Sequence, residues 1–242
     1  MRRALIRRRT RGSDESSAVV GRFRNSFYLR MNARRLEHLA ALGLPLFDRT
    51  VLQVGAGIGD HAQFFLDRGC TVTLTEGRRE NVDVLRRLHP HLPAFELDLD
   101  HPDPAFAERF DVVFCYGTLY HLARPAEAIV YLADRCNEMF LLETCVSLGK
   151  ELGLPQVAEP PHGDQALGGV GSRPTRSWVH GELRRHFQFV YVPVVQPAHP
   201  QFPVDWTAPP IESLTRAVFV ASRVPLDSPL LTTSLPERQR RI

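Results

Sequence analysis

The sequence has few cysteines, and they form no paired motif. Cys70, Cys115, Cys136 and Cys145 lie far apart, with apolar neighbours and no CxxC spacing. A disulfide framework and a zinc site both need cysteines at organised spacings, so neither is expected. We predict four buried free thiols, a reducing compartment and no metal site.

A long apolar run is also missing. No stretch of about 18 apolar residues occurs, so no membrane-spanning helix is expected. The opening stretch MRRALIRRRTRGSDESS lacks the apolar segment of a secretory signal. Its arginines resemble those of a transit peptide, but Asp14 and Glu15 argue against one. The prediction is therefore a cytoplasmic protein.

Lysine is nearly absent, because Lys150 is the only one among the 30 Lys and Arg. Six arginines lie in the first eleven residues and three in the last seven. Without these nine, the 27 Asp and Glu outnumber the basic residues, although the whole chain carries a formal net charge of +3. A nucleic-acid partner is therefore not expected. We predict mobile tails at 1–20 and 224–242.

Strand-like apolar runs alternate with helical patterns through the first part of the chain. A helix that ends near Gly43 precedes them. Strands are expected at 50–54, 71–75, 94–97, 111–116 and 139–143, and helices at 60–68, 79–88 and 125–135. This alternation predicts an α/β fold with a doubly wound, mostly parallel sheet covered on both faces.

The pattern changes after Glu143. Residues 146–176 are rich in Gly and Pro and have no long periodicity, so we expect an insert that contributes to substrate choice. A helix at 177–185 and strands at 189–192 and 214–222 follow. One domain over 21–223 is the resulting prediction.

A glycine-rich turn joins the first strand to the next helix. Gly55, Gly57 and Gly59 would let backbone N–H groups approach a ligand at a helix N-terminus. Glu76 ends the second strand, where a carboxylate can accept both hydroxyls of a ribose. Asp60 stands where a dinucleotide-binding protein would hold a pyrophosphate. Because a carboxylate there repels a pyrophosphate but suits a sulfonium, S-adenosylmethionine (SAM) is a better candidate cofactor than NAD.

Several motifs together resemble those of class I SAM-dependent methyltransferases. They are VLQVGAGIGDHAQFF, the acid Glu76, ELDLD and DVVFCYGTLYHLARPAEAI, and they cover about Val51 to Glu143. The resemblance implies a seven-stranded sheet whose last two strands form an antiparallel hairpin. It also implies transfer of a methyl group from SAM.

The resemblance carries over to individual cofactor contacts. Gly55, Gly57 and Gly59 would pass under the methionine part, Glu76 would bind the ribose, Asp98 the adenine amino group and Leu99 the ring, with Tyr116 and Gly117 near the methyl. Asp100 is an alternative to Asp98. Gln53 departs from the family, which usually has Asp or Glu there, so the contact to the methionine end must differ. His61, just after the turn, is expected either at the amino-acid end of the cofactor or on a helix surface.

Candidate catalytic residues follow the fourth strand. His121 can accept a proton near neutral pH, and Tyr120 shares its position as a candidate or a wall residue. The alternative for His121 is that it caps or packs the following helix. The helix before the first strand, including Tyr28, is expected to act in part as a lid or else simply to pack on the sheet.

Three further residues are candidate substrate contacts. Glu143 would bind a cationic group or else have a structural role. Arg176 and Trp178 would clamp an anionic or planar group or else pack within the loops. We expect a methyltransferase that acts on an O- or N-nucleophile of a small molecule in specialised metabolism. A tRNA or other RNA methyltransferase and a non-catalytic SAM-binding module are the alternatives, and the oligomeric state is left open.

Overall fold

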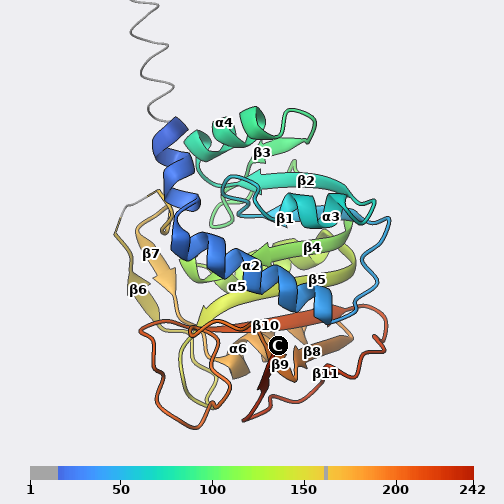
Figure 1. The fold of residues 1–242 in the computed structure, drawn as a ribbon, viewed down its shortest axis with the longest axis vertical. Coiled ribbons are helices and arrows are strands. Elements are labelled where there is room, and N and C mark those ends of the chain that lie inside the picture. The colour runs from blue at the N-terminus through green and yellow to red at the C-terminus, as the bar shows by residue number, and fades with distance from the viewer. Residues whose placement is uncertain (1–15, 161–162) are drawn as a thin grey trace, which may run out of the picture.

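A central sheet of eight strands organises the chain, whose computed structural model describes residues 16–160 and 163–242. The strand order is β11-β8-β10-β5-β4-β1-β2-β3 (Figure 1). The strands are β1 Thr50–Val54, β2 Thr71–Glu76, β3 Ala94–Glu96, β4 Phe110–Tyr116, β5 Cys136–Val146, β8 Phe189–Pro193, β10 Thr215–Ser222 and β11 Leu231–Thr232. The first five in chain order run parallel to one another. This confirms the predicted fold class.

Helices cover both faces of the sheet. They are α2 Ser26–Ala41, α3 Ala62–Leu66, α4 Arg79–Leu88, the 3-10 helix η1 Leu119–His121, α5 Pro125–Asp134 and α6 Arg176–Leu183. Helices α2, α3 and α4 contribute to the core on one face, and α5 and α6 contribute to the core on the other. Figure 1 shows α2 crossing one face of the sheet.

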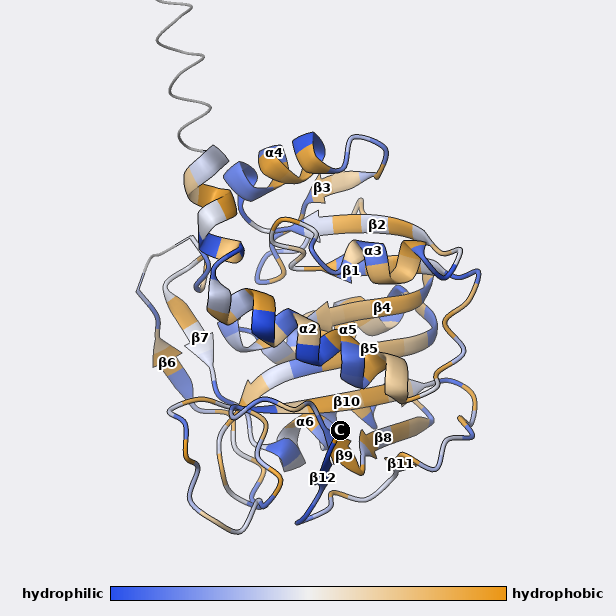
Figure 2. Ribbon diagram, in the orientation of Figure 1, coloured by the Kyte–Doolittle hydropathy of each residue, from blue (hydrophilic) through white to orange (hydrophobic). Residues whose placement is uncertain are grey.

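Alternation of side chains along the strands explains the two cores. Val51 faces the α2 side, whereas Leu52 faces the α5 side. In β4, Phe114 faces the α2 side and Val113 faces the α5 side. Because both faces are covered, the central strands are mostly apolar and not alternately polar, as Figure 2 shows for β4 and β10.

The C-terminal strands form the predicted antiparallel hairpin. β10 lies antiparallel between β5 and β8, with Val218 opposite Glu143 and Val220 opposite Tyr191. The short strand β11 then extends the sheet by pairing with β8, which makes eight strands where seven were predicted.

The prediction of a mobile tail from Val224 onward is wrong. β12 (Arg240–Arg241) pairs parallel with β9 (Val195–Gln196), and the Gln239 amide donates to the Pro193 carbonyl. These residues are polar, so their attachment depends on backbone and amide hydrogen bonds that an apolar pattern does not reveal.

The N-terminal prediction is only partly covered. Residues 1–15 of the predicted disordered tail lie outside the described residues, whereas 16–23 form a helix. The described parts of the insert, 146–160 and 163–176, have more regular structure than their composition indicated. β5 continues to Val146, and β6 (Gln156–Ala158) pairs antiparallel with β7 (Val170–Ser172).

Candidate functional site

A cavity lies where the carboxyl ends of β1, β2 and β4 meet, as expected for an open parallel sheet. It contains about 1020 Å³ of empty space, including the part open to solvent. Helix α2, residues 97–99, η1, the loop at 163–167 and Arg216 of β10 complete its walls.

Eight of the ten predicted cofactor residues line this cavity. They are Gly55, Gly57, His61, Glu76, Asp98, Leu99, Tyr116 and Gly117. Gln53 and Gly59 do not. Gln53 is buried in β1, and its Oε1 has no hydrogen-bond partner among the described residues. A Cβ on Gly59 would approach His89, so this glycine permits packing and does not form part of the wall.

The turn after β1 requires glycine at the cavity wall. Gly57 has φ +58°, which side-chain-bearing residues rarely adopt, and a Cβ there would lie 2.9 Å from the Phe23 ring. Its N–H donates to Glu76 Oε2 at 2.9 Å. This hydrogen bond joins the glycine turn to Glu76, the residue predicted to bind a ribose.

Glu76 is held in place by several donors. Besides Gly57, the Arg78 N–H donates to Oε1 at 3.1 Å and the Asn81 amide does so at 3.3 Å. Burial raises the pKa of Glu76, and the N–H groups of Arg78 and Gly57 partly oppose that rise. A polar ligand at this wall would therefore meet a carboxylate fixed in orientation.

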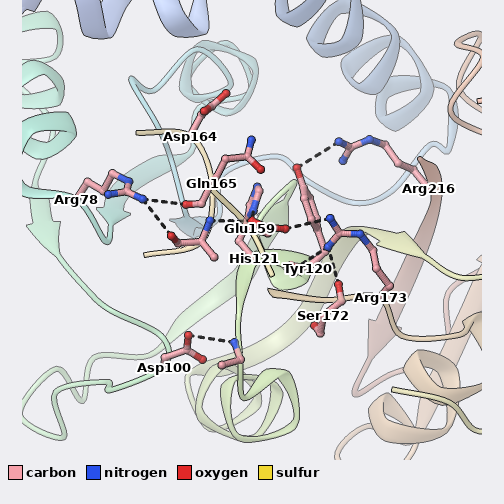
Figure 3. A network of polar contacts seen from close by, with 12 residues as sticks. Arg78, Asp100, Tyr120, His121, Glu159, Asp164, Gln165, Ser172, Arg173 and Arg216 are labelled. Atoms are coloured by element: carbon pink, nitrogen blue, oxygen red, sulfur yellow. Dashed lines mark hydrogen bonds and ion pairs between the residues drawn. The ribbon is translucent and has the colours of Figure 1, made fainter. Parts of the chain in front are cut away.

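The choice between Asp98 and Asp100 has a structural answer. Asp98 lines the cavity and accepts the Asp100 N–H at 2.9 Å. Asp100 instead accepts the N–H groups of Ala123 and Arg124 at 3.1 and 2.9 Å, one of which Figure 3 shows. The geometry therefore favours Asp98 as the residue available to a ligand.

His121 lines the cavity and pairs with a residue that the sequence did not reveal. Its Nδ1 lies 2.5 Å from Glu159 Oε2, just beyond β6 (Figure 3). Arg173 and the Ala166 N–H also donate to this carboxylate, at 3.0 and 2.8 Å. Burial raises the pKa of Glu159, but the His121 hydrogen bond and charge and these donors together lower it to about 2. A carboxylate on Nδ1 leaves Nε2 as the proton acceptor.

Tyr120 and Tyr28 also line the cavity. Arg216 Nη2 donates to the Tyr120 hydroxyl at 3.2 Å, and the Tyr28 hydroxyl donates to Asp164 Oδ2 at 3.1 Å. Burial raises the pKa of both hydroxyls. Helix α2 supplies Phe27 and Tyr28 to the cavity wall, and its Met31 and Leu39 pack in the core on one face of the sheet.

His61 and Tyr116 are buried against Phe114. The His61 ring meets Phe114 edge-on at 5.5 Å, and Tyr116 stacks on it at 4.3 Å. Burial, with a contribution from the Arg35 charge, lowers the pKa of His61 to about 3, so this imidazole is neutral. The Tyr116 hydroxyl has no partner among the described residues.

Glu143 was predicted to contact the substrate, but it does not line the cavity. It is fully buried behind the wall, where Arg35 Nη2 lies 2.5 Å from Oε2 and Arg216 Nη1 lies 3.1 Å from Oε1. Both oxygens are thus occupied by guanidinium groups. The prediction that Glu143 binds a cationic substrate group is wrong in this geometry, because its charge is already compensated.

Arg176 and Trp178 lie away from the predicted site. Arg176 lines a second cavity, stacks over the Trp206 ring at 4.0 Å and donates to the Pro236 carbonyl. Trp178 packs against the hydrophobic core on the α5 side. The sequence placed them together at a helix start, but that start faces another part of the molecule.

Arg216 and Glu159 are the site residues that the sequence analysis missed. Arg216 had a signal, since it interrupts the otherwise apolar strand LTRAVFVAS. Glu159 had none, because it lies in an irregular segment and reaches His121 only through the tertiary structure.

Comparisons with known proteins agree with this architecture. Residues 51–137 match the family model described as a methyltransferase domain. A tRNA U34 carboxymethyltransferase of Shewanella putrefaciens is 33% identical over 114 residues, covering 44% of this chain and 34% of that protein. The protein of the same name from Photobacterium profundum is 32% identical over 125 residues, covering 49% of this chain and 37% of that protein. The chain thus spans about a third of the length of the curated relatives it matches.

Solved structures extend the likeness to most of the chain. The N-terminal domain of EvdMO1, crystallised with S-adenosylhomocysteine (SAH) and D-fucose, has a TM-score of 0.60 at 20% identity, covering 79% of this chain and 82% of that one. The 1,6-didemethyltoxoflavin-N1-methyltransferase of Burkholderia thailandensis has a TM-score of 0.53 at 18% identity, covering 86% of both. The matched domain and the shared topology confirm the predicted resemblance: the chain has the fold of the class I SAM-dependent methyltransferases.

Proposed function

We propose that the protein transfers a methyl group from SAM to an oxygen or nitrogen nucleophile of a small molecule. The observation that carries this proposal is the cavity wall formed by Gly55, Gly57, Glu76 and Asp98 at the ends of three neighbouring strands. This wall offers a close backbone approach, a fixed carboxylate for a ribose and a second carboxylate for an adenine amino group. The matched family model, a methyltransferase domain, supports methyl transfer.

The cavity residues fit SAM both at its nucleoside and near its methyl group. Glu76 and Asp98 would hold the nucleoside, and the unpartnered Tyr116 hydroxyl and Gly117 would lie near the reacting carbon. When bound, SAM supplies an electrophilic methyl group on a sulfonium. The protein's task is then to hold the nucleophile in line with that group and to exclude water.

His121 is the proposed base for a nucleophile that carries a proton. Glu159 orients its ring through Nδ1, so that Nε2 can accept the proton as the new bond to carbon forms. Tyr120, whose ring centre lies 3.9 Å from that of His121, forms the adjoining wall. Helix α2 and the loop at 163–167 would cover the site.

A second candidate substrate is RNA, which the names of the curated relatives suggest. The small-molecule proposal is favoured because acidic residues outnumber basic ones away from the two ends of the chain. The two substrates differ in salt dependence, since binding to phosphates weakens steeply as salt rises.

The test is transfer of a labelled methyl group from SAM to a small-molecule metabolite extract and, separately, to bulk tRNA. We expect label in the small-molecule fraction and a loss of about 100-fold or more with His121→Asn. His91→Asn, at an exposed position outside the cavity wall, is the matched control and should retain activity. Label only in tRNA would favour the RNA alternative, and label in neither would contradict both.

A further inference from the structure

Three buried charged side chains, from α2, β5 and β10, form a cluster at the cavity. Arg35 of α2 is 4% exposed, Arg216 of β10 is 5% exposed and Glu143 of β5 is 0% exposed. Both arginines line the cavity, and Glu143 lies between them. Two guanidinium groups share one carboxylate, so the cluster carries one uncompensated positive charge.

The other groups packed around this cluster do not cancel that charge. Burial lowers the pKa of His61 to about 3 and raises the pKa of the Cys145 thiol to about 11, so both are neutral. Burial also raises the pKa of Tyr116 and Tyr120, which leaves their hydroxyls protonated.

Further neighbours are His199, Asp164 and Arg173, whose charge is paired with that of Glu159. Burial and the two arginines lower the pKa of His199, so it adds no positive charge at neutral pH. Asp164 is partly exposed and accepts the Tyr28 hydroxyl. Solvent at this rim position screens its charge from the buried arginines.

Donor groups of the cluster remain unused. Arg216 donates to Gln201, Glu143 and Tyr120, which uses three of its five N–H bonds. Arg35 Nε and the Tyr116 hydroxyl are buried and have no partner within the described part of the chain. A buried charge with unsatisfied donors is costly unless an anion binds there.

We propose that the acceptor substrate is a carboxylic acid, and that its carboxylate binds to Arg216 and Arg35. The proposal rests on the proposed methyl transfer. Guanidinium groups bind carboxylates with charge-assisted hydrogen bonds, often two at once. Arg216 comes from the strand beyond β5, on the side away from the nucleoside wall, so the acid would occupy the acceptor half of the cavity with its nucleophile directed toward His121.

The test compares matched acids and amides on the full chain. Calorimetric titrations with saturating SAH would use benzoate and benzamide, 4-hydroxybenzoate and 4-hydroxybenzamide, and hexanoate and hexanamide. We expect at least one acid to bind about tenfold or more tightly than its amide. Equal or weaker binding by every acid would overturn the proposal.

Two variants separate this role from a structural one. Arg216→Gln should abolish the preference for the acid, and Arg216→Lys should retain part of it. Glu143→Gln should strengthen acid binding about threefold or more, because it removes the competing carboxylate. Thermal unfolding and SAH affinity would establish that each variant folds. Weaker acid binding in a folded Glu143→Gln protein would count against the proposal.

A further titration distinguishes binding of a substrate carboxylate from binding of the cofactor's own carboxylate. SAH carries a carboxylate, whereas 5′-methylthioadenosine does not. We expect Arg216→Gln to leave the affinity for both within about twofold, and a loss confined to SAH would overturn the assignment. If the wild-type protein binds neither, the proposed function fails, while the comparison of acids with amides can still be made without SAH.

Discussion

The nucleoside wall and the acceptor half of the cavity differ in how far apart their contacting residues lie in the sequence. The nucleoside wall comes from short segments at the ends of β1, β2 and β3, so Gly57, Glu76 and Asp98 each lie next to a strand. The acceptor half is assembled from α2, η1, the insert and β10, and its contacts join residues of different elements, such as Arg216 and Tyr120, which are 96 positions apart. The first half follows from local motifs, whereas the second depends on the tertiary structure.

The largest effect is expected in the nucleoside wall. Glu76→Ala removes a carboxylate held by three donors, and we expect SAH affinity to fall about 10- to 100-fold. Calorimetric titration with SAH measures this. Glu96→Ala, at an exposed position on the neighbouring strand, is the control and should bind like the wild type. Equal losses in both variants would contradict the assignment of Glu76.

The glycine turn should be the next most sensitive feature. Gly57→Ala forces a side chain onto a backbone at φ +58° and against Phe23, so we expect about 1–2 kcal/mol of lost stability and weaker SAH binding. Gly21→Ala has nothing within 4 Å and lies in a helix, so it should stabilise the protein by about 0.5–1 kcal/mol. Urea unfolding compares the two, and an unaltered Gly57→Ala protein would disprove the strain argument.

In the acceptor half, Glu159→Gln should lower the free energy of unfolding by about 1–3 kcal/mol at pH 7. The pKa of Glu159 is depressed from 4.5 to about 2, so its contribution is complete above pH 4.5 and is lost as the pH falls toward 2. The difference between wild type and variant should therefore shrink on acidification. Exposed Glu127→Gln serves as the control and should cost less than about 1 kcal/mol. A difference that grows at low pH would contradict the pairing with His121.

The smallest effect is expected outside the cavity. Arg176→Gln changes a side chain of the second cavity, so SAH affinity should stay within about twofold of the wild type. Isothermal calorimetry under the conditions used for Glu76→Ala tests this. A tenfold loss would mean that the two cavities communicate, against the present division of the molecule.

Sequence reasoning succeeded where chemistry and chain direction coincide. The carboxyl end of a parallel strand fixes where the next few residues lie, so the sequence could place Gly57, Glu76 and Asp98 at the wall of one cavity. It failed for Gln53 and Gly59, because membership of a motif does not determine which side chain reaches the cavity. It also failed for Glu143, since the two arginines that occupy it come from α2 and β10. The C-terminal segment was taken for a tail because its short strand pairs and scattered leucines, such as Leu230 and Leu235, form no periodic apolar pattern.

The most direct measurement is a calorimetric titration of the wild-type protein with SAH and with NAD. The account predicts saturable binding of SAH with a stoichiometry of one and no binding of NAD, because Glu76 and Asp98 fit a single adenosine. Binding of NAD in place of SAH would contradict the central claim.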